Sequence, residues 1–315
     1  MGTSAVGTEL STMLSQLLGD AEIHDLHRLS GGASRETWRF TANGRALILQ
    51  RQRSGDQRNM LVEAGVVGAA RRGGVPVPEL IDARCRDDGM AFMVLEAIDG
   101  ESIARKIQRD DEFAAARPRL TADFGHALAR IHALDLSQID GLEATDQLAY
   151  YTDVLDSLGQ PHPVLELVRN WLVDTRPTSD RTCVVHGDFR LGNIIVGPDG
   201  LRAVIDWELA HLGDPMEDLG WLCVKAWRFG GSAPVAGLGA YDELFSAYEE
   251  AGGAPVDPVA VHWWEVLGTW KWAIMCILQA SVHLNGMSRS HELAAIGRRV
   301  CENEHDLLCS LDGRW

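Results

Sequence analysis

The sequence lacks the marks of secreted, membrane-spanning and zinc-binding proteins. None of its six cysteines forms a Cys-x-x-Cys pair, so their spacing predicts neither a disulfide framework nor a zinc site. The N-terminus has no basic segment followed by a long apolar run, so we expect no secretion signal. The apolar stretch 270–282 is interrupted by Lys271 and Gln279 and is too short to span a bilayer. We therefore predict a cytoplasmic protein with reduced, buried thiols.

Basic residues are also scarce. The chain has 29 Lys and Arg against 45 Asp and Glu, which gives a formal net charge of −16. Such a surface repels the phosphates of nucleic acids and anionic membranes, so we expect neither as a partner. ATP is an anion as well. A nucleotide site in this chain would therefore need a local positive field from Mg²⁺, basic side chains and backbone N–H groups.

Several common catalytic motifs are missing. The chain contains no Gly-x-Gly-x-x-Gly segment, so a dinucleotide site of the Rossmann type is not indicated. It also contains no Gly-x-Ser-x-Gly or His-Glu-x-x-His segment, which makes a hydrolase a poor interpretation. The length of 315 residues and a hydrophobic content of 46% are enough for a large core in one large domain or two lobes.

The pattern of the chain predicts an α+β fold with two lobes. Residues 1–20 and 58–73 have helical spacing, and 24–29, 35–41, 46–51, 80–84 and 90–98 resemble strands. Asn43-Gly44 between two such runs is a strong hairpin signal. After Gly100 the chain is mainly helical, with predicted helices at 102–117, 119–135, 146–158, 162–175, 217–228, 239–252, 257–285 and 289–310. We expect a small antiparallel sheet lobe over 1–98 and a larger helical lobe over 99–315.

The segment 186–193, HGDFRLGN, carries the strongest chemical signal. It contains His-x-Asp-x4-Asn (His186, Asp188 and Asn193), and an apolar strand, a hairpin, a second strand and Asp206 follow it. Phosphoryl transfer needs one carboxylate to accept or orient the hydroxyl proton, and an amide oxygen and a second carboxylate to hold Mg²⁺. We assign Asp188 as the base and Asn193 and Asp206 as the metal ligands. Each residue alone could equally be a turn residue, but the ordered set favours chemistry.

These motifs resemble those of the aminoglycoside phosphotransferase and choline-kinase family, whose fold is similar to that of protein kinases. The resemblance includes His186–Asn193, Ile205–Glu208 and Gly213–Leu219, and it extends from about residue 24 to 310. It implies a two-lobed kinase-like fold and a small-molecule phosphotransferase that uses ATP and Mg²⁺. In the last of these segments, we expect the carboxylate of Asp218 to accept hydrogen bonds from the backbone of the loop 186–193.

The resemblance implies further nucleotide contacts in the small lobe. Glycines let a backbone approach phosphates, so we expect the loop Ser30, Gly31, Gly32, Ala33 and Ser34 to face them, although it could be an ordinary hairpin turn. The backbone of Glu96 and Ile98 is expected to hold the adenine.

The cation that usually pairs with the phosphates is uncertain in this chain, because the third strand has no lysine. Side chains alternate across a strand, so only one of Gln50 and Arg51 faces the nucleotide. The resemblance places Gln50 at this position, but we favour Arg51 because of its charge, with Glu63 as its helix partner. The alternatives are a solvated arginine at a strand end and a surface glutamate.

The acceptor is expected to be a small hydroxylated molecule bound at the helical lobe. Segment 257–285 has Glu265 but is otherwise mainly apolar or aromatic, which argues mildly against a polycationic aminoglycoside. Its tryptophans, among them Trp263 and Trp270, either pack in the core or line the acceptor site. The chain is most similar to the branch that resembles kinase domains fused to acyl-CoA dehydrogenases, which implies a hydroxy acid or hydroxyacyl thioester. The alternatives are an aminoglycoside or amino alcohol, and a nucleotide-binding pseudokinase scaffold. Oligomeric state is not predicted.

Overall fold

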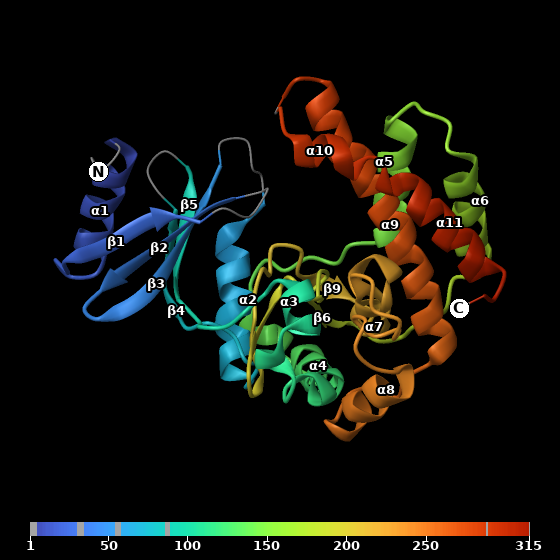
Figure 1. The fold of residues 1–315 in the computed structure, drawn as a ribbon, viewed down its shortest axis with the longest axis horizontal. Helices are drawn as coiled ribbons and strands as arrows, with labels where there is room; N and C mark the ends of the chain where they lie inside the picture. Colours follow the sequence, from blue (N-terminus) through green and yellow to red (C-terminus); the bar gives the residue numbers. More distant parts are fainter. Residues whose placement is uncertain (1–4, 30–34, 54–57, 86–88, 288, 315) are drawn as a thin grey trace.

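The fold consists of a sheet-based small lobe and a larger helical lobe (Figure 1). The structure is a computed structural model that describes residues 5–29, 35–53, 58–85, 89–287 and 289–314. The predicted α+β fold, with a small antiparallel sheet followed by a helical region, is confirmed.

The small lobe is built on five antiparallel strands in the order β1-β2-β3-β5-β4. The Asn43-Gly44 turn joins β2 and β3, and both of its residues have positive φ (51° and 72°), as a tight hairpin requires. The predicted hairpin is therefore confirmed. The elements of this lobe are α1 (Ala5–Leu17), β1 (Ile23–Arg28), β2 (Arg35–Ala42), β3 (Arg45–Gln52), α2 (Met60–Arg72), β4 (Leu80–Cys85) and β5 (Ala91–Glu96).

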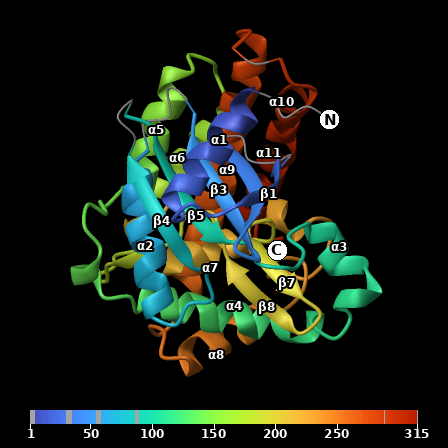
Figure 2. The same ribbon diagram turned by 90° about the vertical axis from the view of Figure 1, so that its left-hand side faces the viewer.

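The two faces of this sheet have different neighbours. On the outer face, Phe40, Leu49 and Val94 pack against Leu10 and Leu14 of α1, which lies across the strands (Figure 2). On the inner face, residues such as Met93 and Leu95 join the large core that includes α2 and the helical lobe. The period-2 alternation of the strands therefore leaves the inner face available to form a cleft wall.

The helical lobe contains two short antiparallel strand pairs, β6 with β9 and the β7–β8 hairpin. The long helix α9 passes through its core, where Trp263 and Trp270 donate to the carbonyls of Leu172 and Leu165 of α6. These two tryptophans are core residues. The elements are α3 (Ala104–Arg109), α4 (Arg117–His132), α5 (Gln147–Ser157), α6 (Pro163–Asp174), β6 (Cys183–Val185), β7 (Ile194–Gly197), β8 (Gly200–Val204), β9 (His211–Gly213), α7 (Met216–Cys223), α8 (Tyr241–Glu250), α9 (Pro258–Leu284), α10 (His291–Ile296) and α11 (Arg299–Leu311).

Several expectations about local structure were wrong. The helix expected at 289–310 is divided into α10 and α11. The helix expected at 102–117 is the short α3 followed by a 3-10 turn, because the backbone is extended at Asp110. The helix expected at 217–228 ends at Cys223, and a 3-10 turn follows it. Strand β9 has only three residues, too few for an alternating pattern, and was missed. Of the thiols, Cys85 and Cys301 are exposed rather than buried. Within the described part of the chain, no helix is long and apolar enough to cross a membrane.

The connector between the lobes is held against β7. Glu101 and Val196 exchange two backbone hydrogen bonds of 2.9 Å. Gly100, with φ of 151°, lies so close that a Cβ there would be 2.7 Å from the carbonyl oxygen of Val196. A glycine is therefore required at this contact, which brings β7 up to the inner face of the small-lobe sheet.

Candidate active site

A cavity lies between the inner face of the small-lobe sheet and the β7–β8 hairpin. The sheet contributes Ile48, Met93 and Leu95, and the helical lobe contributes Ile195 and Ile205, so most of its walls are apolar. Its polar part carries Gln50, Glu63 and Asp206, and the connector residues Glu96, Ile98 and Gly100 also line it. An apolar slot with a few polar groups is the usual form of a small-molecule site.

The register of the hairpin decides which side chain of β3 faces this cavity. Gln50 is opposite Thr37, and both line the cavity. Arg51 is opposite Glu36 and donates to its carboxylate at 2.6 Å and 3.1 Å. The expectation that Arg51 faces the nucleotide is therefore wrong, because the alternation of the strand turns its side chain away from the cavity.

The expected partner of Arg51 was Glu63, and that pairing is also wrong. Glu63 of α2 forms an ion pair with Arg35, the first residue of β2, and both side chains are buried. Glu208, two residues beyond Asp206, pairs with Arg58 at 2.7 Å and lies 3.6 Å from Arg35. Sequence reasoning missed Arg35, since its contact with α2 depends on the arrangement of distant segments.

The carboxylate of Asp188 is held by three donors from three residues. Its Oδ1 accepts from Arg190 Nε and Trp221 Nε1, each at 2.9 Å, and its Oδ2 accepts from Asn193 Nδ2 at 2.6 Å. A side chain held in this way has one orientation, as a catalytic base requires. Arg190 lies within the motif and Trp221 lies 33 residues further along the chain, and neither role was predicted.

Asn193 and Asp206 lie on either side of the β7–β8 hairpin. Because the Asn193 amide nitrogen donates to Asp188, its Oδ1 is oriented away from that carboxylate. Asp206 has positive φ (66°), a strained conformation for a residue with a Cβ. Burial raises the pKa of the Asp206 carboxyl to about 7, and the charges of Glu208, Asp188 and Glu63 add to this rise. The site therefore concentrates negative charge that a bound cation would relieve.

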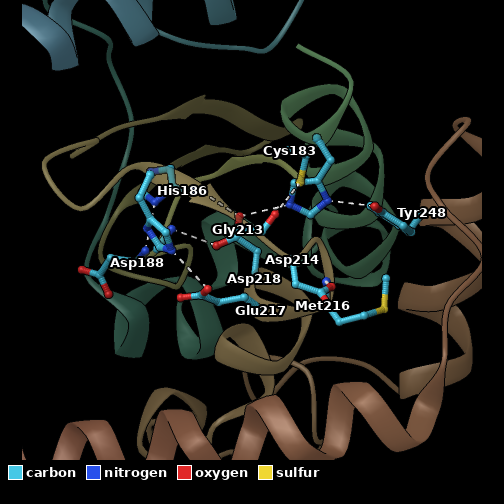
Figure 3. Close-up of polar contacts among 12 residues, drawn as sticks. Cys183, His186, Asp188, Gly213, Asp214, Met216, Glu217, Asp218 and Tyr248 are labelled. Carbon is cyan, nitrogen blue, oxygen red and sulfur yellow. Dashed lines mark hydrogen bonds and ion pairs between the residues drawn. The ribbon is translucent and has the colours of Figure 1, made fainter. Parts of the chain in front are cut away.

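The loop 186–193, which we call the catalytic loop after its expected role, is held to the start of α7 by Asp218 (Figure 3). Its carboxylate accepts from the backbone N–H groups of His186 at 2.8 Å and Gly187 at 3.0 Å. His132 Nε2 lies 3.2 Å from the same carboxylate, and Tyr248 contacts the other nitrogen of His132 at 2.8 Å. The expectation that Asp218 binds the loop backbone is confirmed. Burial opposes ionisation of Asp218, but these donors outweigh it and hold its pKa below the ordinary value.

His186 supports the loop from within. It is fully buried, its Nδ1 accepts from the N–H of Asp188 at 3.2 Å, and its Nε2 lies 3.1 Å from the carbonyl oxygen of Ile205. Burial lowers the pKa of His186, so the imidazole is neutral and links the backbone of Asp188 to that of Ile205. This arrangement agrees with a supporting role and not with proton chemistry.

We predict that Asp218→Asn destabilises the chain by about 2–4 kcal/mol, because an amide nitrogen would replace one acceptor oxygen and leave buried donors unpaired. Urea unfolding at pH 7 measures this loss. The lowered pKa means that the contribution of Asp218 is present above the ordinary carboxyl range and is lost as the pH falls through the folded-state value. Tyr248→Phe, which removes only the outer hydroxyl of the network, is the matched control and should cost less than half as much. Equal stability of Asp218→Asn and wild type would contradict the assignment.

Two further predicted contacts concern the nucleotide base and phosphates. Glu96 and Ile98 both line the cavity, but the N–H of Glu96 already donates to the carbonyl of Glu79 at 2.9 Å. The expected adenine contacts of the Glu96 and Ile98 backbone stay predictions, and for Glu96 they would be made by the carbonyl. The loop Ser30, Gly31, Gly32, Ala33 and Ser34 lies outside the described residues.

Aromatic and cationic side chains surround Asp188 in the helical lobe. Arg190 lies over the ring of Trp227 at 4.6 Å, and Trp227 contacts Trp221 with ring centroids 5.2 Å apart. Lys271 of α9, only 3% exposed, places its ammonium 4.8 Å from the Trp221 ring and 5.4 Å from the Tyr151 ring. Trp221 of α7 thus contacts Asp188 directly, and Trp227 of the following 3-10 turn lies behind it against Arg190 and Trp221.

Comparisons with known proteins agree with this geometry. The model of the phosphotransferase enzyme family matches residues 25–255. Acyl-CoA dehydrogenase family member 10 of Mus musculus is 28% identical over 67% of this chain, and the match covers only 21% of the mouse protein. A solved structure from Ralstonia eutropha, assigned to the aminoglycoside phosphotransferases, has a TM-score of 0.71 at 22% identity and covers 89% of this chain and 90% of its own.

A second solved structure is a ternary complex of a thermostable mutant of aminoglycoside phosphotransferase APH(4)-Ia with ADP and hygromycin B. Its TM-score is 0.64 at 15% identity, over 96% of this chain and 98% of that one. At such identities the two solved structures support the fold. The family match spans well over half of the chain, and the kinase-like fold agrees with it. The chain belongs to the phosphotransferase enzyme family.

Proposed function

We propose that this chain is a Mg²⁺- and ATP-dependent kinase that transfers the γ-phosphoryl group to a hydroxyl of a small molecule. The observation that carries the proposal is the orientation of Asp188 by Arg190, Trp221 and Asn193, together with a cavity between the lobes that is lined by Asp206. ADP is bound in a solved neighbour of the same fold, which supports the same nucleotide here.

The residues present fit a magnesium ion. Asn193 offers an amide oxygen and Asp206 a carboxylate, and both are hard oxygen ligands of the kind that Mg²⁺ prefers. The raised pKa of Asp206 reflects the crowding of its carboxylate by Glu208, Asp188 and Glu63, which a cation would offset. When bound to the phosphates, Mg²⁺ would neutralise the charge on the phosphoryl oxygens.

The proposed chemistry at Asp188 is a single in-line displacement. Asp188 accepts the proton of the acceptor hydroxyl as the oxygen forms a bond to the γ-phosphorus. The bond from that phosphorus to the bridging oxygen of the β-phosphate breaks, and ADP leaves. Arg190 and Trp221 hold the Asp188 carboxylate toward the acceptor throughout this step.

We propose a hydroxy acid or a hydroxyacyl thioester as the acceptor. Arg190 donates to Asp188, and the buried ammonium of Lys271 lies over Trp221, so cations and aromatic rings surround the base. An anionic or acyl group could contact Arg190 and Lys271 there, whereas these two side chains offer no partner to the ammonium groups of an aminoglycoside. The similarity to acyl-CoA dehydrogenase family members, in which the matched region is a small part of the chain, supports an acyl acceptor.

The test is ADP formation by the wild-type chain with Mg²⁺ and ATP across a panel of acceptors. The panel contains short hydroxy acids, hydroxyacyl thioesters, amino alcohols and aminoglycosides, with a reaction lacking acceptor as the control. We expect at least tenfold stimulation by a hydroxy acid or thioester. Turnover with aminoglycosides alone would support the proposed kinase reaction but would contradict the proposed acceptor. ATP binding in a thermal-shift assay without turnover on any acceptor would favour the pseudokinase scaffold.

A further inference from the structure

Arg35 and Glu63 form a buried ion pair, and burying both charges costs free energy. The side chains of Arg35 and Glu63 are 4% and 5% exposed, so both charges have left water. The free-energy cost of removing two charges from water is offset only by good geometry and further hydrogen bonds. Yet Arg35 Nε is buried and, among the described residues, has no hydrogen-bond partner. The carboxylate of Glu208 is 3.6 Å from this nitrogen.

The register of the sheet places this cation on the face that forms the cavity. Arg35 is opposite Gln52, and the next residues on that face are Thr37 and Gln50, which line the cavity. Arg35 Nη1 lies 3.5 Å from Gln50 Oε1, so the guanidinium reaches the position from which a basic residue of β3 would act. Glu63 lines the same cavity and pairs with this guanidinium.

The other arginines of the hairpin have other partners, although Arg39 also lines the cavity. Arg51 pairs with Glu36 on the opposite face, and Arg39 lies 3.4 Å from Asp99. Arg35 is also close enough to Asp206 for their charges to interact. It therefore lies near both the helix carboxylate and the proposed metal ligand, in an adjoining cavity that shares Glu63 and Trp207 with the first.

We propose that Arg35 supplies the phosphate-binding cation of this site, positioned by Glu63, and that β2 thus takes the role that a basic residue at Gln50 of β3 would have. The inference rests on the proposed function, since it assumes that a nucleotide occupies the cavity. A guanidinium presents several donors in a fixed plane and can hold two phosphate oxygens while Glu63 holds its other edge.

The test measures nucleotide affinity by calorimetry, independently of turnover. Arg35→Gln should weaken ATP and ADP binding by about 10- to 100-fold, in keeping with the loss of charge-assisted hydrogen bonds. Adenosine, which has no phosphate, should bind as it does to wild type. Arg35→Gln/Glu63→Gln removes both charges at once and tests the same loss in a chain that keeps no unpaired buried carboxylate. Arg51→Gln, whose partner is Glu36 on the other face, is the matched control and should leave all three affinities unchanged.

The decisive experiment moves the positive charge from residue 35 to residue 50. Gln50→Arg in the Arg35→Gln background should restore at least half of the lost affinity on a logarithmic scale, because Glu63 can then pair with residue 50. A purely structural role of Arg35 predicts no such rescue. ATP affinity equal to wild type in both Arg35 variants would overturn the inference and leave the proposed function intact. Failure of the wild-type chain to bind any nucleotide would instead overturn the proposed function.

Discussion

Asp188→Asn is expected to lower kcat by about a thousandfold, which corresponds to about 4 kcal/mol of transition-state stabilisation. The asparagine keeps the size of the side chain but cannot accept the hydroxyl proton. It also presents an amide nitrogen to donors from Arg190, Trp221 or Asn193, which now all face carboxylate oxygens. Acceptor-dependent ADP formation under saturating ATP measures the effect.

The affinity for ATP should change little in this variant, because Asp188 does not line the cavity between the lobes. A calorimetric Kd within about threefold of wild type would separate lost chemistry from lost binding. Asp153→Asn, at an exposed position of α5, is the control for the loss of one surface charge. Full activity of Asp188→Asn in a folded chain would remove Asp188 from the role of base.

The catalytic loop could be predicted because its residues are close together in the sequence as well as in the structure. Asp188, Asn193 and Asp206 are brought together by one loop and one short hairpin, so their spacing in the sequence nearly determines their spacing in space. Asp218 was predicted for the same reason, since the following motif leads directly into α7. The donors from Trp221 and the cation–ring contact of Lys271 depend on the packing of α7 against α9, which no spacing in the sequence reports.

The cation of the small lobe was mispredicted because charge was given more weight than register. The two-residue turn at Asn43-Gly44 places Ala42 opposite Arg45, and counting outward from it places Glu36 opposite Arg51. That cross-strand pair of opposite charges was readable in the sequence and identifies Arg51 as a residue of the outer face. The pairing of Arg35 with Glu63 was not readable, because it depends on how α2 crosses the sheet.

This correction also weakens the argument for a pseudokinase. The scaffold interpretation relied on a missing lysine in β3, but a buried arginine from β2 occupies the neighbouring position and pairs with the helix carboxylate. Absence of a residue type from one strand therefore does not imply absence of its charge from the site. Binding of ATP that depends on residue 35 would show that the missing lysine of β3 is no evidence for a scaffold, and turnover would then decide between the two interpretations.

Asp206→Asn is expected to abolish turnover, by about a thousandfold or more, and at the same time to stabilise the chain without nucleotide above neutral pH. The activity is lost because the carboxylate that would hold Mg²⁺ is gone. The stability rises because the Asp206 carboxyl has a pKa of about 7 in the folded chain, raised by burial and by neighbouring carboxylates, against 3.8 ordinarily. In that interval the unfolded chain releases the proton that the folded chain keeps, so wild-type stability falls as the pH rises from about 4 to 7.

Asparagine carries no charge and removes this dependence. The variant should match wild type within about 1 kcal/mol at pH 5 and exceed it at pH 8 by on the order of 2–4 kcal/mol, as measured by urea unfolding without Mg²⁺. Added Mg²⁺ and ATP should narrow the difference at pH 8 by stabilising wild type alone. Asp153→Asn should show no pH-dependent gain. A pH-independent difference would mean that Asp206 does not titrate in this range. A fully active Asp206→Asn chain would remove it from the metal site. Loss of activity together with a gain of stability is a result that no purely structural role of Asp206 can produce.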